Sequence, residues 1–220
     1  MTTTGIKRAK TSSAVVDWAH REIFEGRLRP GERIDVPSIT ATLGVSPTPV
    51  REALVLLERE GVITSQFHRG AYVEHFDAHT LRADYYLLGM VSGIAAARTT
   101  LQREPGVLAE LEQLLAELRA ATDDVRRADV ESRILRVQHR AGGTPRLLAV
   151  LRGSGRFLAW MAGHSERRTP DEVVTSHAIV IDHILGRRSK AASRARLDAA
   201  RVVGEHVIAE LVENGVIDAP

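Results

Sequence analysis

In the first quarter of the chain, apolar residues recur three and four positions apart, in three separate runs. This spacing places them on one face of an α-helix, so each run predicts an amphipathic helix. The first predicted helix begins at Ser12 or Ser13 and ends at Gly26, and the second covers about 37–43. The third starts after Ser46, and its apolar face consists of Val50, Leu54 and Leu57.

The third predicted helix leads with polar side chains. Ser46 suits the N-cap position, and Pro47 suits the first turn because it has no backbone N–H to satisfy. With the apolar face turned inward, Thr48 and Arg51 point outward. A short helix, a turn at Gly44 and a helix with a polar leading face follow the order of a helix-turn-helix. In that motif the second helix enters the major groove of DNA.

After Gly61 the pattern changes from helix to strand. Residues 62–66 and 71–73 read as strands, and the connection from Phe67 to Gly70 between them predicts a two-stranded wing. The connection carries Arg69, and an arginine at the tip of a wing can reach phosphates or the narrow minor groove. The N-terminal third is therefore predicted to be a winged helix-turn-helix.

From about Ala78 onward, every apolar run has helical spacing, and glycine or proline separates the runs. The predicted fold class is therefore mainly α, with an N-terminal winged helix-turn-helix that has a small β-wing and a C-terminal all-α helical bundle. The six helices predicted for the bundle cover about 79–100, 106–121, 123–141, 145–163, 170–185 and 189–213.

The length and composition suggest a division into two domains and exclude several kinds of site and segment. A chain of 220 residues suits two domains, predicted at 12–76 and 77–220, after a flexible basic arm or plain disordered tail over 1–11. The net charge of +2 is too small to identify a nucleic-acid binder by itself. The absence of cysteine excludes disulfides and thiolate metal sites. No apolar run approaches the roughly 20 residues of a membrane span, so we expect a soluble, cytoplasmic protein.

The string ITATLGVSPTPVREALVLLEREGVI, followed by HRGAYV, resembles the winged-helix domain of GntR-type bacterial transcription regulators. The resemblance covers most of residues 12–75 and implies that this domain binds DNA. The family usually has a DNA-contacting arginine where this chain has Pro47, so one charged contact is lost from each protomer. The residues that we expect to form the DNA-binding site are Ser46, Thr48, Pro49, Arg51, His68, Arg69 and Gly70.

The helical part resembles the effector-binding (FCD) domain of the FadR subfamily, in its shorter six-helix variety. The resemblance rests on the number of helices, on the junction AGGTPRLL at 141–148 and on His177 before an Ile-rich helix. It implies a homodimer that binds an inverted-repeat operator in double-stranded DNA and responds to a small-molecule effector, expected to be an organic acid. Many members bind a divalent metal ion such as zinc through one Asp and three His, and the metal helps to hold a carboxylate effector.

Only part of that metal-binding set is present here. The family's Asp corresponds to Glu131 and its second His to His177, but its first His corresponds to Leu135. Its last His corresponds to Ala199, although His206 lies on about the same helix face and is the alternative. Glu131, His177 and His206 are therefore the candidates for effector or metal binding. A hydrogen-bonded core histidine, a partly exposed carboxylate and an effector pocket without metal are the alternative interpretations.

Together these features predict a dimeric, effector-responsive DNA-binding transcription regulator, which we expect to be a repressor. We expect no enzyme activity, because the chain has no Gly-rich phosphate loop, no nucleophile elbow and no Asp/Glu pair at catalytic spacing. Two alternatives stay open: a ligand-independent dimeric DNA-binding protein, and a helical metalloenzyme fused to a DNA-binding head.

Overall fold

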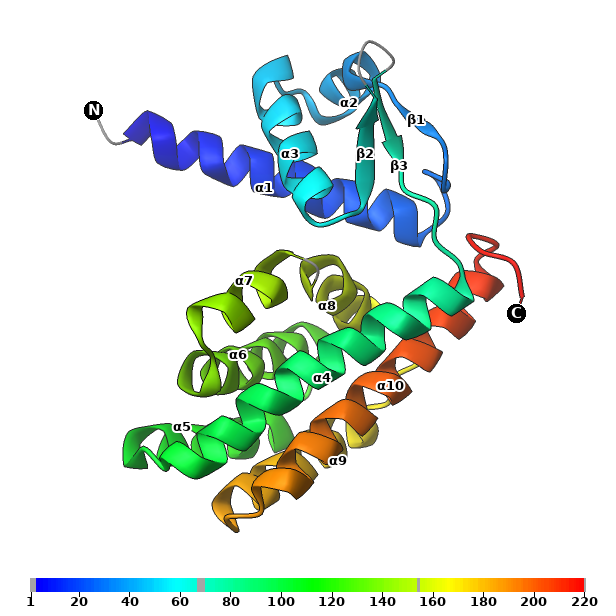
Figure 1. Ribbon diagram of the computed structural model, residues 1–220. Coiled ribbons are helices and arrows are strands. Elements are labelled where there is room, and N and C mark those ends of the chain that lie inside the picture. The colour runs from blue at the N-terminus through cyan, green and yellow to red at the C-terminus, as the bar shows by residue number, and fades with distance from the viewer. Residues whose placement is uncertain (1–2, 67–69, 154, 220) are drawn as a thin grey trace.

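The computed structural model describes residues 3–66, 70–153 and 155–219. A small head lies on one end of a larger helical domain, and Figure 1 shows the head at the top. The head is a winged helix-turn-helix and the larger domain is all α, so the predicted fold class is confirmed. No helix among the described residues has the length and apolar character needed to cross a membrane.

The helix-turn-helix of the head is defined by two local signals. The side chain of Asp35 caps the second helix by accepting a hydrogen bond from the backbone N–H of Ser38 at 2.9 Å. The same helix ends at Gly44, whose φ of 62° lies in the left-handed region that glycine adopts without strain. The three helices of the head are α1 (Thr3–Phe24), α2 (Val36–Leu43) and α3 (Pro47–Arg59).

Helix α1 begins earlier than expected. We predicted a flexible arm over residues 1–11 and a helix from Ser12 or Ser13, but the helix starts at Thr3. The segment before Ser12 contains no proline and includes alanine, lysine and arginine, which favour helix, so the helix continues back past both serines. Ser12 itself is buried inside the helix and does not begin it.

The sheet of the head has three strands where we expected two. β2 (Ile63–Gln66) and β3 (Gly70–Val73) form the predicted antiparallel pair. The additional strand β1 (Arg33–Ile34) pairs with the other edge of β3, which gives the order β1-β3-β2. A two-residue strand is too short to show the alternation that predicts a strand, so only the pairing reveals it.

The helical domain has seven helices in its described part, one more than expected. The helix predicted over 145–163 is two helices on either side of position 154, which lies outside the described residues. Gly153 and Gly155 flank this position, and glycine disfavours a continuous helix. The seven helices are α4 (Ala78–Gln102), α5 (Pro105–Arg119), α6 (Asp124–Gly142), α7 (Pro145–Gly153), α8 (Gly155–His164), α9 (Pro170–Leu185) and α10 (Ser189–Glu213).

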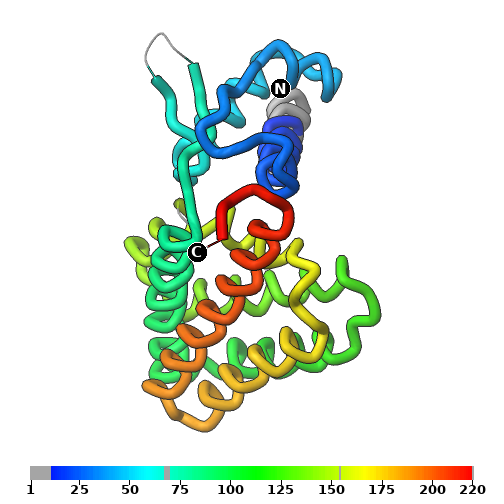
Figure 2. The backbone as a smooth tube through the Cα atoms, turned by 90° about the vertical axis from the view of Figure 1, so that its right-hand side faces the viewer, coloured from blue at the N-terminus to red at the C-terminus, as the bar shows by residue number. Residues whose placement is uncertain are grey.

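Helices α4 and α10 lie side by side along the length of the domain (Figures 1 and 2). A Cβ atom on Gly93 would lie 2.8 Å from the backbone oxygen of Ser193, and a Cβ atom on Gly204 would lie 2.9 Å from the side chain of Tyr85. Real Cβ contacts are longer than this, so glycine allows the two helices to approach closely. α6 packs against α4 and α9 against α10, and together these helices enclose the interior of the domain.

The head and the helical domain share one apolar core. Val16 and Ile23 of α1 belong to the same cluster of buried residues as Phe157 and Met161 of α8. Leu211 at the end of α10 belongs to it as well. The head is therefore packed on the helical domain as well as joined to it through the chain between β3 and α4.

Candidate functional site

The outward face of α3 carries the predicted reading residues. Ser46, Thr48 and Arg51 are exposed, and Ser46 has the extended backbone of an N-cap but makes no capping hydrogen bond with its side chain. Pro49 is buried, because it lies on the side of α3 that packs into the head. The exposed face of α3 therefore carries Thr48 and Arg51, with Ser46 just before the helix and Val55 further along it.

The tip of the wing is described only in part. His68 and Arg69 lie outside the described residues, and Gly70 begins β3 in an exposed position. A Cβ atom on Gly70 would lie 3.2 Å from Nε of Arg33, so the Arg33 guanidinium lies beside the base of the wing. Arg33 is exposed, and it was not found from the sequence because the strand that carries it was not predicted.

Two of the three effector or metal candidates are in contact. Nε2 of His177 on α9 lies 3.0 Å from Oε1 of Glu131 on α6. The third candidate is elsewhere: His206 lines a groove between α9 and α10, where its Nε2 lies 4.0 Å from the carboxylate of Glu172. The structure therefore does not bring all three together, since His206 lines this groove and Glu131 and His177 line a separate cavity.

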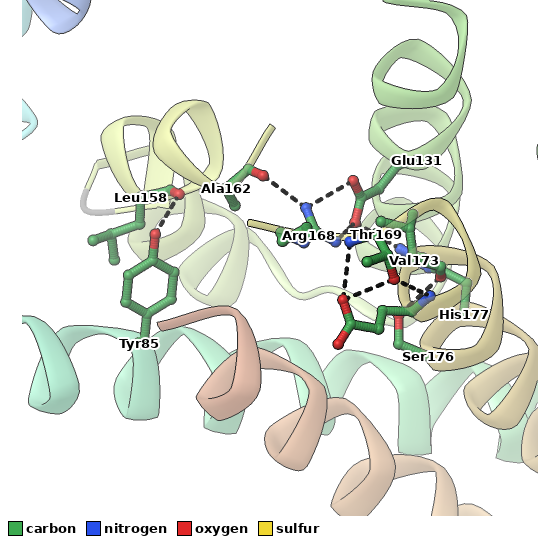
Figure 3. A network of polar contacts seen from close by, with 10 residues as sticks. Tyr85, Glu131, Leu158, Ala162, Arg168, Thr169, Val173, Ser176 and His177 are labelled. Atoms are coloured by element: carbon green, nitrogen blue, oxygen red, sulfur yellow. Dashed lines mark hydrogen bonds and ion pairs between the residues drawn. The ribbon is translucent and has the colours of Figure 1, made fainter. Parts of the chain in front are cut away.

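The partner of Glu131 that the sequence did not indicate is Arg168, in the loop between α8 and α9. Its guanidinium donates to both carboxylate oxygens of Glu131, at 2.6 and 3.1 Å, and to the carbonyl oxygen of Ala162 at 2.7 Å. Figure 3 shows Arg168 lying between Ala162 and Glu131. The contact is nearly closed to solvent, since 7% of the Arg168 side chain and 14% of the Glu131 side chain are exposed.

The charges of this cluster follow from its burial and contacts. Burial alone would raise the pKa of Glu131, but the hydrogen bond from His177 and the charge of Arg168 together hold it well below its ordinary value. Burial lowers the pKa of His177 more than the hydrogen bond to Glu131 raises it. His177 is therefore neutral at pH 7 and Glu131 ionised, so Nε2–H of His177 donates to the carboxylate.

The residues of this cluster do not fit a divalent metal ion. Leu135 and Ala199, at two of the family's histidine positions, line the same cavity with apolar side chains. Among the described residues, no three histidines, aspartates or glutamates come together in a way that could hold a metal. In addition, Arg168 already neutralises Glu131 and would repel a second cation there.

A cavity of about 750 Å³ opens from this cluster toward the head. Helices α4, α6, α8, α9 and α10 form most of its wall, and Leu56, Arg59 and Glu60 at the end of α3 line its other side. A volume of several hundred Å³ with a mostly apolar wall and a few polar groups is typical of a small-molecule site. The cavity therefore lies between the helical domain and the helix that carries Thr48 and Arg51.

A second arginine, Arg196 on α10, lines the cavity and is 5% exposed. Its Nη2 donates to Oε1 of Gln138 at 2.8 Å, and its Nε has no hydrogen-bond partner among the described residues. Nearby, Nε2 of His139 lies 3.1 Å from Oγ of Ser92. Burial and the charge of Arg196 lower the pKa of His139 to about 4, so His139 is neutral at pH 7.

The end of α3 is tied to α1 and α8 by a second polar cluster. Nε2 of His20, which is fully buried, lies 2.9 Å from Oε2 of Glu60. Nε of Arg156 on α8 lies 3.4 Å from the other oxygen of Glu60, and Nη2 of Arg156 lies 3.6 Å from Asp17 on α1. Glu60 and Arg156 also line the cavity, so a molecule in it would lie next to this cluster.

A winged helix-turn-helix head on a helical domain defines a class of DNA-binding transcription regulators. A model of the family described as "Bacterial regulatory proteins, gntR family" matches residues 11–73. An uncharacterised HTH-type transcriptional regulator of Mycobacterium tuberculosis is 31% identical over 201 residues, which cover 90% of this chain and 81% of that relative. The chain belongs to the gntR family of bacterial regulatory proteins and is a DNA-binding transcription regulator.

Solved structures share this fold. A putative GntR transcriptional regulator from Rhodococcus sp. RHA1 has a TM-score of 0.60 at 19% identity, covering 90% of this chain and 97% of that one. McbR/YncC of E. coli has a TM-score of 0.59 at 20% identity, covering 87% and 94%. At these identities the likeness concerns the fold alone.

Proposed function

We propose that the protein is a homodimeric repressor of the FadR subfamily that binds an inverted-repeat operator and releases it when a small organic acid enters the cavity. The observation that carries the proposal is the position of the cavity, whose wall includes both the helical domain and the end of α3. A ligand there touches the helix that presents Thr48 and Arg51 to DNA. Occupancy of the cavity and placement of the reading helix are therefore coupled.

The reading surface in this proposal consists of the exposed part of α3 and the wing. Thr48 and Arg51 lead into the major groove, and Ser46 and the wing residues contact the backbone or the minor groove. Pro49 supports the helix from inside the head, since it is buried. Because Pro47 cannot make the contact of the family's arginine, Arg51 provides the charged contact on this helix.

Dimerisation through α4 is supported by an exposed apolar stripe. Tyr86, Met90 and Ile94 follow one another at intervals of four residues, with exposed fractions of 44%, 39% and 46%. Leu87 beside them is 41% exposed. Contiguous apolar surface of this kind marks an interaction site, and one helix face that packs on its own copy gives the two-fold axis that an inverted repeat requires.

The effector acts by differential binding. A ligand that fits the cavity better in one arrangement of head and helical domain shifts the protein to that arrangement, and each 1.4 kcal/mol of preference changes operator affinity about tenfold. The cluster of His20, Glu60 and Arg156 links the wall of the cavity to α1 and α3, so it is the contact through which a shift would reach the reading helix.

The test is a titration of labelled DNA from upstream of the gene, measured by fluorescence anisotropy in low salt. We expect specific binding by the wild type and loss of it in Arg51→Ala, with the dimer intact in sedimentation. Arg119→Ala is the matched control, because Arg119 is exposed on α5, far from the head. Binding no tighter than to unrelated DNA, or full affinity in Arg51→Ala, contradicts the proposal.

A further inference from the structure

Two arginines with buried side chains, Arg168 and Arg196, line the cavity, and one of them contacts a carboxylate. Arg168 forms a two-pronged ion pair with Glu131, so its charge is balanced. Arg196 contacts the neutral amide of Gln138, and its Nε has no partner in the described part of the chain. One buried positive charge in the cavity is therefore without a counter-ion.

A buried guanidinium without an anion is costly, because its charge has lost water and gained no opposite charge in contact. Burial lowers the pKa of Arg196 to about 10, against the more distant attraction of Glu131. At pH 7 the side chain is still charged. An anion bound beside Arg196 would balance this buried charge.

The rest of the wall favours an anion with an apolar body. Two glutamates line the cavity in its described part, Glu60 and Glu131, and each already contacts an arginine. Leucine, alanine and valine side chains form much of the remaining wall around Arg196. The arginines that line the cavity are Arg59, Arg136, Arg152, Arg156, Arg168 and Arg196.

We propose that Arg196 binds the carboxylate of a small organic acid directly, without a metal ion, with the apolar part of the acid against Leu135, Ala199 and Val203. The proposal rests on the regulator function only for the consequence of binding; the site itself follows from the cavity. Ser92 and the neutral His139, which line the same cavity, offer further hydrogen bonds to the carboxylate.

The charge favours a monocarboxylate over a phosphate ester. Arg59, Arg136 and Arg152 are exposed to solvent, so the buried part of the cavity has one unbalanced guanidinium. It matches a single negative charge, whereas a phosphate ester carries about −1.5 to −2 at pH 7. An excess negative charge in the buried part of the cavity would face Glu131. Carboxylates and phosphate esters of similar size therefore form the two arms of the test.

The experiment uses the full chain, treated with EDTA and freed of it, at constant ionic strength. Hexanoate and benzoate are the carboxylate probes, hexanol and benzamide their uncharged counterparts, and phenyl phosphate the phosphate arm. We expect the carboxylates alone to raise the melting temperature and to give a binding isotherm by calorimetry, with no gain from added zinc. No response to either carboxylate, a response that requires zinc, or a stronger response to phenyl phosphate overturns the proposal.

The variants separate binding from folding. In Arg196→Met the carboxylate response falls by about tenfold or more, while the free protein still folds, because removal of an unbalanced buried charge offsets the loss of the hydrogen bond to Gln138. Arg152→Gln is the matched control at an exposed arginine of the same cavity and keeps the response. If Arg196→Met does not fold, Arg196→Gln is used, which also removes the charge, and a carboxylate affinity equal to wild type in either variant overturns the proposal.

Operator binding without any acid is measured in parallel. If DNA binding is intact and no carboxylate binds, the inference about Arg196 fails while the DNA-binding part of the proposed function stands. If carboxylates bind through Arg196 and operator affinity does not change, the site stands and the proposed effector response fails. The two proposals are thus tested separately.

Discussion

Nε2 of the buried His20 lies 2.9 Å from the carboxylate of Glu60, the C-cap residue directly after α3. This contact joins the first helix of the head to the reading helix at the point where both face the helical domain. Arg156 approaches the same carboxylate from α8 at 3.4 Å. Glu60 is therefore the place where three helices from both parts of the molecule are held together by charge and hydrogen bonding.

Glu60→Gln is expected to destabilise the whole protein. The substitution leaves Arg156 without its charged partner at this site and weakens the bond to His20, and loss of a buried polar partner costs about 1–3 kcal/mol. Urea unfolding followed by circular dichroism measures the change. Glu112→Gln on α5, at an exposed glutamate, is the control, and an equal effect in both variants would show that the contact does not matter for stability.

Pro47→Arg should strengthen DNA binding. Position 47 is exposed at the start of α3, where the family usually has an arginine. A restored phosphate contact steepens the dependence of log affinity on log salt by roughly 0.9 for each protomer. Anisotropy titrations over a range of salt concentrations test this, with Pro47→Ala as the uncharged control. Equal salt dependence in the two variants would mean that the side chain at position 47 does not reach DNA.

Met90→Glu should dissociate the proposed dimer. A charge in the middle of the stripe that includes Tyr86 and Ile94 would be buried without a partner on association, which weakens the dimer by at least about a hundredfold. Sedimentation at several concentrations measures this. Val125→Glu is the control, since Val125 is 83% exposed and lies on α6, away from the stripe. A dimer that survives Met90→Glu would place the interface elsewhere.

Glu131→Gln is expected to lower stability at pH 7 by about 3–5 kcal/mol, because it leaves the guanidinium of Arg168 buried without its anion. The pKa of Glu131 is held below its ordinary value of 4.5 in the folded protein. Its contribution is therefore fully present above the unfolded-state pKa and is lost as the pH falls through the lower folded-state pKa.

The difference in unfolding free energy between wild type and Glu131→Gln should accordingly narrow as the pH is lowered below about 4.5. Urea titrations at pH 7, 5, 4 and 3.5 measure it. A difference that is constant across this range would show that the ionised carboxylate does not stabilise the fold. Glu112→Gln serves again as the exposed control.

The helix-turn-helix was predictable because its signals are local. The left-handed turn at Gly44, the N-cap position of Ser46 and the apolar face with Val50 and Leu57 each depend on residues within a few positions. The strand at Arg33 was not predictable, because two residues become a strand only through pairing with Tyr72 and Ala71.

The contacts in the cavity were predictable only in part. Glu131 and His177 were found through the resemblance, but nothing local marks Arg168 as the partner of Glu131 or Arg196 as buried. Arg196 lies in a stretch rich in arginine and alanine that resembles a solvent-exposed helix face. Its burial is decided by the packing of α10 against α4 and α9, which joins segments far apart in the sequence.

The core that the head shares with the helical domain also bears on the order of folding. Val216 and Ile217, which follow α10, are buried in the same cluster as Val16 and Ile23 of the first helix. The contacts of the head with residues 216–217 therefore form only after these residues have been synthesised. We expect a chain that ends before Val216 to have a less stable head and therefore weaker operator binding.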